Sequence, residues 1–315
     1  MSVAETTRVL ILLSFLAAVC LAEVSLVVAF TLGRLKKKKT NILIRPPAIL
    51  VHALTAAIIA CVLWAYFVEP YRLEVNIIPI RTNKLMNVTF RIVQISDLHC
   101  DRKARNEKRL VEAINALEPD IVVFTGDALN SAGALPTFKR TLAELKASVA
   151  KLAVRGNCDL GHWAHVDLFS DTGFQLIEGK TVSLTKNGET LSMTGLACLH
   201  LSPFKGLLEE APSDRVSVLL CHYSDLIESL GGLGVDLYLS GHTHGGQVAL
   251  PIYGALVTLA KYGKKYESGL YKVGETTLYV NRGVGMEGGF APRVRFFARP
   301  EVAVFDIGPA EQAAP

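Results

Sequence analysis

The chain has 315 residues, which is enough for one large domain or two smaller ones. Half of the residues are apolar, and the formal net charge at pH 7 is only +4. So small a positive charge does not indicate a nucleic-acid-binding protein, and we expect no nucleic acid among its partners. Six cysteines without the spacing of a disulfide framework exclude a small disulfide-stapled domain.

The apolar excess is concentrated near the N-terminus, in two long runs. Residues 9–33 contain one charged side chain, Glu23, and residues 46–68 contain none. A bilayer core takes about 20 apolar residues per helix, so each run is long enough to span it. We therefore expect transmembrane helices within residues 1–33 and 46–68. Two buried core helices are the alternative, but uncharged runs of this length are rare in soluble domains.

A cleaved signal peptide is a second alternative for the first run. Glu5 accompanies Arg8 ahead of the run, which makes a poor positive n-region, and the run continues well past the small residues near Cys20. We therefore expect a retained anchor. A carboxyl group inside a span is costly unless it faces protein or water. Glu23 is accordingly expected either to pair with the second span near His52 or to be hydrated at the interface.

A basic loop, residues 34–45, joins the two runs and includes four consecutive lysines at 36–39. Basic loops stay on the cytoplasmic side, which places the large C-terminal part on the extracytoplasmic face of the cytoplasmic membrane. The loop also suits anionic headgroups, so the lipid bilayer is an expected partner. Reduced cysteines fit the cytoplasm better, and a cytoplasmic C-terminal part remains the alternative.

The rest of the chain alternates between strands and helices, which is typical of an α/β domain. Residues 69–88, with Pro70 and Pro79, are expected to be a linker, followed by a domain at 89–308 and a disordered tail at 309–315. The expected helices are 105–117 and 134–149. The expected strands are 89–95, 120–125, 151–155, 174–178, 181–184, 190–196, 216–221, 235–239, 277–280 and 302–307. An antiparallel hairpin is expected around Lys186-Asn187-Gly188.

Polar clusters directly follow five of these strands. They are Asp97-Leu98-His99, Gly126-Asp127, Gly156-Asn157-Cys158-Asp159, Cys221-His222 and Gly241-His242-Thr243-His244. Sites in α/β sheets form at the carboxyl ends of strands, so these side chains are expected to meet. A single histidine is usually an ordinary buried polar residue. Four histidines, two aspartates and an asparagine in this pattern instead favour a metal centre, suited to manganese, iron or zinc.

In this order the five clusters resemble the calcineurin-like metallophosphoesterase superfamily, over about residues 90–310. The segments similar to its membrane-anchored or exported branch are Val93-Gln-Ile-Ser-Asp-Leu-His99, Leu239-Ser-Gly-His-Thr-His-Gly-Gly-Gln247, Asn281-Arg-Gly-Val-Gly285 and Val294-Arg-Phe-Phe-Ala-Arg-Pro-Glu301. The resemblance implies an α/β fold, a two-sheet βαββ sandwich flanked by helices, here preceded by the two transmembrane helices.

The resemblance also implies two divalent metal ions between the ends of the sheets. Asp97, His99 and His244 would bind one ion, and Asn157, His222 and His242 the other. Asp127 would bridge both. Two cations about 3.5–4 Å apart clamp the attacking and leaving oxygens of a phosphoryl displacement and activate water.

One motif departs from the family, whose usual Gly-Asn-His-Asp or Gly-Asn-His-Glu is Gly156-Asn157-Cys158-Asp159 here. The resemblance assigns the catalytic roles to Asp127, Asn157, Cys158 and Asp159. The replaced histidine would protonate the leaving group or stabilise the transition state. A thiol carries no positive charge, and its reference pKa is about 8.5 against about 6.5 for histidine. Poor leaving groups should therefore suffer most.

These features favour a hydrolase of a phosphodiester or pyrophosphate bond, whose good leaving group needs an acid least. The similar UDP-2,3-diacylglucosamine pyrophosphatases also replace this histidine, and an anchor would bring the site to a lipid-linked, phosphorylated substrate. UDP-sugars are cytoplasmic, so an external domain would fit an envelope phospholipid better. The alternatives are a metal-binding scaffold without catalysis, which retention of all seven ligands disfavours, and a phosphomonoesterase or protein phosphatase, which the missing acid disfavours.

Some notable residues lie outside the motifs. His162, His165 and His200 are expected to be solvent-facing or hydrogen-bonded and not to bind metal. Apolar residues at 204–208 and 256–262 fit a membrane-facing lip and equally fit ordinary packing of a helix and a loop.

Overall fold

The computed structural model describes residues 1–37, 41–198, 204–209, 213–288 and 293–310. The chain divides into two compact units, residues 1–68 and 69–315, each described here by itself. The boundary falls at the expected end of the second apolar run. The expected tail at 309–315 lies outside the described residues from residue 311 on, as does His200.

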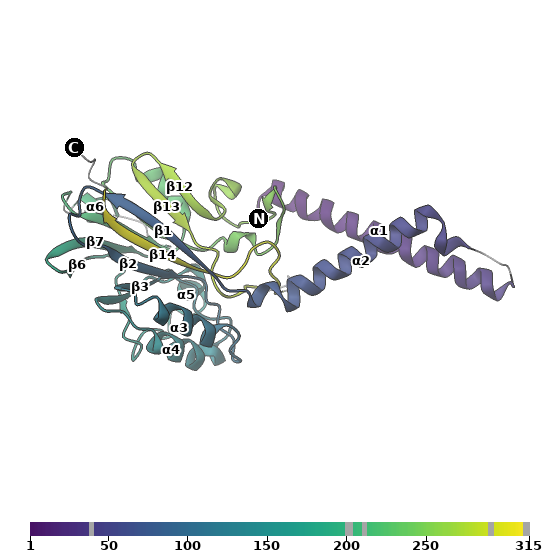
Figure 1. Cartoon of the computed structure of the whole chain (residues 1–315), viewed down its shortest axis with the longest axis horizontal. Coiled ribbons are helices and arrows are strands. Elements are labelled where there is room, and N and C mark those ends of the chain that lie inside the picture. Colours follow the sequence, from purple (N-terminus) through teal and green to yellow (C-terminus); the bar gives the residue numbers. More distant parts are fainter. Residues whose placement is uncertain (38–40, 199–203, 210–212, 289–292, 311–315) are drawn as a thin grey trace. The chain divides into compact units, whose positions relative to one another are not determined.

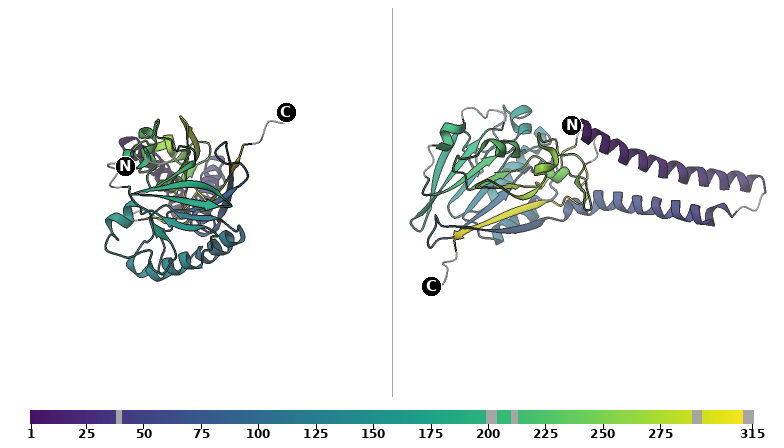
Figure 2. Two further views of the ribbon diagram at one scale, coloured as in Figure 1. Left: turned by 90° about the vertical axis from the view of Figure 1, so that its left-hand side faces the viewer. Right: turned by 90° about the horizontal axis from the view of Figure 1, so that it is seen from above.

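Unit 1 consists of two long helices, α1 (Val3–Leu35) and α2 (Pro46–Phe67), with a short 3-10 helix, η1 (Ile42–Ile44), before α2. Figures 1 and 2 show α1 and α2 running antiparallel along each other. Both are long and apolar enough to cross a membrane. Only Glu5 and Val19 of α1 and Ala48 and Ala65 of α2 are buried, whereas a core helix of a soluble domain buries one face.

A polar pair joins the two helices of unit 1. The ring nitrogen Nδ1 of His52 on α2 lies 2.8 Å from a carboxylate oxygen of Glu23 on α1. Thr55 donates to the same oxygen at 3.3 Å. The expected pairing of Glu23 with His52 is confirmed. It gives a carboxyl group in an apolar run the partners that such a group requires.

Unit 2 contains two six-stranded sheets that pack face to face. The first has the order β1-β14-β2-β3-β4-β5. Its strands are β1 (Glu74–Thr82), β2 (Phe90–Ile95), β3 (Ile121–Phe124), β4 (Ala150–Ala153), β5 (Gln175–Leu176) and β14 (Glu301–Pro309). Because β2 to β5 run parallel, their carboxyl ends share one edge of the sheet.

The second sheet has the order β12-β13-β9-β8-β7-β6. Its strands are β6 (Lys180–Lys186), β7 (Glu189–Leu196), β8 (Val216–Cys221), β9 (Leu237–Ser240), β12 (Gly269–Val273) and β13 (Thr276–Val280). The four central strands are parallel, and β6 and β12 flank them antiparallel. The hairpin between β6 and β7 turns at Asn187 and Gly188, with φ of +49° and +84°, as the Asn-Gly pair predicts.

Apolar side chains fill three layers of unit 2. Phe90, Val123 and Phe305 of the first sheet meet Met193 and Leu239 of the second. Helices α3 (Glu107–Ala116) and α4 (Leu135–Glu144) cover the outer face of the first sheet (Figure 1). The outer face of the second sheet carries α6 (Phe204–Glu209) and the 3-10 helix η4 (Ser224–Ser229). The expected two-sheet α/β sandwich with flanking helices is confirmed.

Several element boundaries differ from the expectation. Strand β14 continues to Pro309, and Ala310 N–H donates to the Thr82 carbonyl, so the first two residues of the expected tail at 309–315 belong to the sheet edge. Strand β12 was not expected. Residues 69–88 are not only a linker, because β1 lies within them and pairs with β14 over nine residues, from Glu74 to Thr82. Pro79 is tolerated because β1 is an edge strand, where a missing N–H costs no ladder bond. The expected helix at 134–149 ends at Glu144, because Asn115 accepts from the Lys146 N–H and donates to the Glu144 carbonyl.

Candidate metal centre

The polar clusters of both sheets meet at one edge of unit 2. Asp97 and His99 follow β2, Asp127 follows β3, and the short helix α5 (Asn157–Gly161) follows β4. From the second sheet, His222 follows β8, and His242 and His244 follow β9. Two groups of potential ligand atoms each lie within 4.8 Å of one another: Asp97, His99 and His244, and Asp97, Asp127 and His222.

The first group brings together one expected ligand set. The Nε2 atom of His244 lies 3.2 Å from Oδ1 of Asp97. The imidazole rings of His99 and His244 have centroids 4.9 Å apart. All three side chains are buried. This spacing suits two imidazoles and one carboxylate around a single cation.

Asp127 lies between the two groups. Its Oδ2 atom is 3.6 Å from Nε2 of His99 and 3.3 Å from Nε2 of His222. Nε2 of His222 is also 3.9 Å from Oδ1 of Asp97. A carboxylate that faces an imidazole of each expected ligand set occupies the place of a bridging ligand.

The remaining two expected ligands border the second group. The ring of His242 lies 5.3 Å, centroid to centroid, from the ring of His222. Its Nε2 atom is 3.4 Å from the Leu259 carbonyl oxygen. Asn157 begins α5 with its Oδ1 atom buried.

The donor atoms themselves indicate a cation site. Buried side-chain atoms without a hydrogen-bond partner in the described part of the chain include Nε2 of His99, His222 and His244, and Oδ1 of Asn157. Buried polar atoms in proteins are normally paired, and an unpaired one costs about 1–3 kcal/mol. Four such atoms around two buried carboxylates fit divalent metal ions, which would supply the missing partner to all of them.

Backbone strain is concentrated at the same residues. Asp97, His99, Asp127, His242 and His244 all have φ between +36° and +74°. Residues other than glycine seldom adopt this conformation, which costs about 1–3 kcal/mol each and is typical of functional sites. Glycine permits the loops to pack this closely, since a Cβ on Gly241 would lie 2.0 Å from Oγ of Ser96.

Asp159 holds the loops from behind. Its carboxylate accepts from the backbone N–H groups of Asp127, Ala128 and Gly156, at 2.8, 2.8 and 2.9 Å. The side chain is fully buried and faces backbone. These contacts fit a residue that positions the loop of Asp127, and the direct catalytic role expected for Asp159 stays a prediction.

Two further groups orient the ligands and were not expected from the motifs. The Nδ1–H of His222 donates to the Thr125 carbonyl at 2.7 Å, which leaves Nε2 to face the carboxylates. The fully buried Arg295 donates to the carbonyls of Arg282, Gly283 and Gly285. Gly285 in turn donates to the Asp97 carbonyl at 2.8 Å. Arg295 lies in the segment 294–301 that resembles the family, but nothing in the sequence distinguishes it from other arginines, because its burial appears only in the structure.

Burial and charge set the protonation of the ligands. Burial lowers the pKa of His99 and of His242 to about 4, so both are neutral imidazoles near pH 7, the form that binds metals. For His222 the carboxylates of Asp127 and Asp97 outweigh burial and raise the pKa to about 10. The two buried carboxylates thus favour positive charge at the place where a cation is expected.

Cys158 is buried beside Asp127, and its N–H donates to the Asp127 carboxylate at 2.9 Å. Burial raises the pKa of this thiol well above its usual range, and the Asp127 charge adds to the shift, so the group is neutral. Its Sγ atom lies 4.0 Å from Oε1 of Glu287. Burial likewise raises the pKa of Glu287. No motif signalled Glu287, which follows the similar segment 281–285 by two residues.

The fold and this centre define a metal-dependent phosphoesterase. Residues 90–246 match the family Calcineurin-like phosphoesterase, and the chain belongs to this family. It is 34% identical to "Uncharacterized metallophosphoesterase YkuE" of Bacillus subtilis, over 78% of this chain and 88% of that protein. It is 26% identical to "UDP-2,3-diacylglucosamine pyrophosphatase LpxG" of Chlamydia muridarum, over 80% of this chain and 94% of that protein. An uncharacterized metallophosphoesterase of Aquifex aeolicus is 29% identical, over 79% and 97% respectively.

Proposed function

We propose that this chain is a membrane-anchored hydrolase with two divalent metal ions that cleaves a phosphodiester or pyrophosphate bond of a lipid-linked substrate. The buried carboxylates surrounded by unpaired imidazole nitrogens carry this proposal. A UDP-2,3-diacylglucosamine-type molecule and an envelope phospholipid share the required chemistry, a phosphoryl centre attached to an acylated group. The likeness to the pyrophosphatase LpxG supports the first.

The residues divide the work by position. Asp97, His99 and His244 would hold one ion, Asn157, His222 and His242 the other, and Asp127 both. The bound ions, manganese, iron or zinc, would polarise the phosphoryl group and activate water. Asp159 and Arg295 fix the loops that carry the ligands, so the donor atoms need little rearrangement during the reaction.

Cys158 narrows the type of bond. A neutral thiol donates weakly and cannot stabilise a departing oxyanion as a protonated imidazole does. A leaving group whose conjugate acid has a low pKa departs without that help. Examples are the nucleoside monophosphate released from a pyrophosphate and the acidic alcohol released from a phosphodiester. Phosphomonoesters of simple alcohols are therefore the poorest expected substrates.

The first test is turnover by the full-length protein, with added manganese, of bis-p-nitrophenyl phosphate against p-nitrophenyl phosphate. We expect the diester to be the better substrate and chelation to abolish its turnover. Metal binding without turnover of either compound would reject the enzyme in favour of a metal-binding scaffold. Faster turnover of the monoester would favour a phosphatase.

The side of the membrane separates the two lipid substrates. The basic loop, residues 34–45, supports an extracytoplasmic catalytic unit. Protease accessibility on oriented vesicles measures this directly. Digestion of unit 2 only from the extracytoplasmic side would support an envelope phospholipid. Digestion only from the cytoplasmic side would reject that placement and support the UDP-linked lipid, whose hydrolysis would then be assayed by release of UMP.

A further inference from the structure

We propose that two loops beside the metal centre form an apolar lip that lies in the interface of the bilayer to which the chain is anchored. The lip consists of residues 249–255, with Leu259, and residues 296–297. This inference rests on the proposed function in one respect, since a lip in the bilayer would admit a lipid-linked substrate to the site. The physical contact itself is independent of turnover.

The tips of these loops present large apolar side chains outward. Ile252 is fully exposed, and Leu259 and Phe297 are 55% and 57% exposed. Single apolar residues are common on protein surfaces. Here, however, Ile252, Leu259 and Phe297 all have positive φ, of +68°, +56° and +50°. Three large apolar side chains are thus exposed at residues whose backbone conformation is unfavourable.

The strain is greatest at Ile252. It occupies the tip of a short hairpin between β10 (Ala249–Leu250) and β11 (Gly254–Ala255), where Tyr253 N–H donates to the Pro251 carbonyl at 2.7 Å. A tight turn around a β-branched residue with positive φ is a rare and strained arrangement. Such strain persists where the surrounding structure imposes it and is associated with function. A glycine would fit this turn without cost, so the isoleucine side chain is the unexplained feature.

Both loops are attached to the metal-ligand loop. Phe296 N–H donates to the Gln247 carbonyl, and Ala249 N–H donates to the Phe296 carbonyl, each at 2.8 Å. Gln247 follows His244 by three residues. The carbonyl of Leu259 faces Nε2 of His242 at 3.4 Å. The lip thus borders the metal centre directly.

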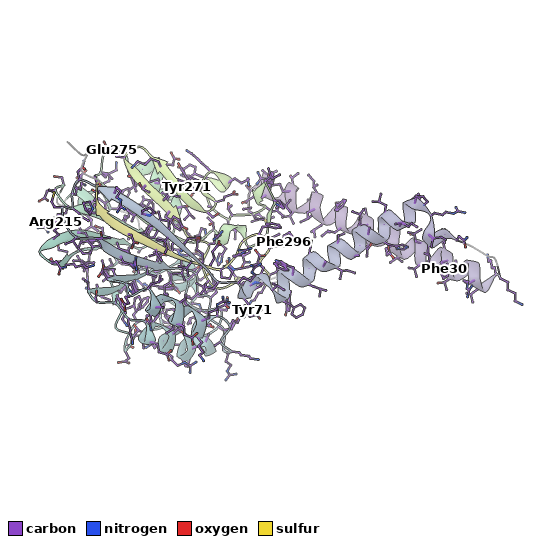
Figure 3. All side chains as sticks on the ribbon, viewed as in Figure 1. Phe30, Tyr71, Arg215, Tyr271, Glu275 and Phe296 are labelled. Carbon is purple, nitrogen blue, oxygen red and sulfur yellow. The ribbon has the colours of Figure 1, made fainter. Side chains whose placement is uncertain are left out.

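The connection to unit 1 enters unit 2 at the same edge. Glu74 N–H, at the start of β1, donates to the Pro300 carbonyl, three residues after Phe297. Glu74 also accepts from Arg282, next to the loop that contacts Asp97. Tyr71 and Phe296 lie toward one end of unit 2, and Arg215 and Glu275 toward the other (Figure 3).

This placement identifies the occupant. Six residues separate Phe67, the end of α2, from Glu74, and a fully extended chain of that length reaches about 20 Å. The short segment that leaves α2 therefore enters unit 2 at the edge that carries the candidate metal centre and the lip, and the bilayer is the occupant that we propose for the lip. Apolar and amphipathic side chains at such an edge suit the boundary between headgroups and acyl chains. Lys261 lies two residues from the exposed Leu259, and Lys264, paired with Glu267, bonds to the Tyr253 carbonyl of the hairpin.

Tryptophan probes test the contact in the full-length protein. Phe297→Trp and, as a second lip variant, Tyr253→Trp would be reconstituted in nanodiscs of phosphatidylethanolamine and phosphatidylglycerol with or without brominated acyl chains. Met86→Trp is the matched control, because Met86 is 64% exposed but precedes β2 and so lies at the opposite edge of the first sheet. Spectra of the parent protein, with Trp64 and Trp163, are subtracted.

We expect brominated lipid to quench both lip probes and to leave the Met86→Trp signal unchanged. Equal signals from lip and control probes would overturn the proposal. The proposal would also be overturned if the lip probes became shielded from lipid as the protein concentration rises, because a second copy of the chain would then cover the lip. A functional measurement accompanies this one: Phe297→Ala should lower the rate on hexadecyl p-nitrophenyl phosphate in vesicles relative to the rate on soluble bis-p-nitrophenyl phosphate. If neither compound is hydrolysed, the proposed function fails while the quenching still decides the lip.

Discussion

Two sets of loops at the same edge of unit 2 adopt the same unfavourable backbone conformation in opposite surroundings. In the metal-ligand loops, Asp97, Asp127 and His244 have positive φ and are buried. In the lip, Ile252 and Phe297 have positive φ and are exposed. Strain of this kind costs about 1–3 kcal/mol per residue wherever it occurs. What differs is the group that each loop presents and what compensates for the cost.

The compensation is visible inside the metal centre. Asp159 accepts three backbone N–H groups there, and Arg295 donates to three carbonyls of the neighbouring loop. The lip has backbone hydrogen bonds at its base, between Ala249, Phe296 and Gln247, but its tips extend beyond them. On the two proposals above, the first set would be fixed for ligand geometry and the second for outward display. Substitutions should therefore affect chemistry and stability in the first set, and membrane contact in the second.

The largest effect is expected from Asp127→Asn. An amide presents one oxygen and no charge between the two ligand sets, so the bridge is lost. Substitution of a group that only orients a metal ligand typically lowers metal affinity or activity by about 10–100-fold. For a residue that binds both ions we expect a larger loss, of more than about 100-fold in kcat/KM for bis-p-nitrophenyl phosphate. The exposed Asp214 provides a matched control, Asp214→Asn, which should retain activity. Comparable activity of the two variants would reject Asp127 as the bridging ligand.

A smaller loss is expected from Asp159→Asn. The variant keeps the side-chain shape but weakens three hydrogen bonds to the loop that carries Asp127. Metal affinity, measured by calorimetric titration of the full-length protein, should fall about 10–100-fold, as for other residues that orient ligands. The control is Asp167→Asn, which changes an exposed carboxylate that also accepts backbone N–H groups, from Phe169 and Ser170. Equal metal affinity in both variants would contradict the positioning role.

A gain that depends on the leaving group is expected from Cys158→His. An imidazole at this position restores the acid that the family usually has, and the benefit grows as the leaving group becomes poorer. We expect a gain of up to about tenfold on phenyl phosphate, below the 10²–10⁴-fold of a fully positioned acid, and less on p-nitrophenyl phosphate. Cys158→Ala separates this effect from a simple change of volume. An equal response of both substrates to Cys158→His would count against the acid argument.

The sequence predicts the parts of this edge that local patterns determine. Five polar clusters after apolar strands placed the metal-ligand residues at one edge, and the apolar runs predicted the helices of unit 1. It did not predict that the Asp159 carboxylate faces backbone N–H groups, because the direction in which a side chain points cannot be read from a sequence motif. Nor did it predict Arg295 or Glu287, whose contacts depend on the tertiary packing of segments far apart in the chain. The apolar residues at 256–262 predicted the lip only in part, since Leu259 is exposed but Leu256 is buried.

The smallest effect is expected from Phe297→Ala on folding stability. Phe297 is exposed, and surface substitutions usually change the free energy of unfolding by no more than about 0.5 kcal/mol. The buried Phe124, in the layer between the first sheet and its helices, gives the contrast, because Phe124→Ala removes core packing worth about 3–5 kcal/mol. Denaturant titration of both full-length variants in detergent measures the difference in their free energies of unfolding. A loss above about 1 kcal/mol for Phe297→Ala would mean that this ring stabilises the fold of unit 2, and outward display toward the bilayer would no longer explain its strained backbone.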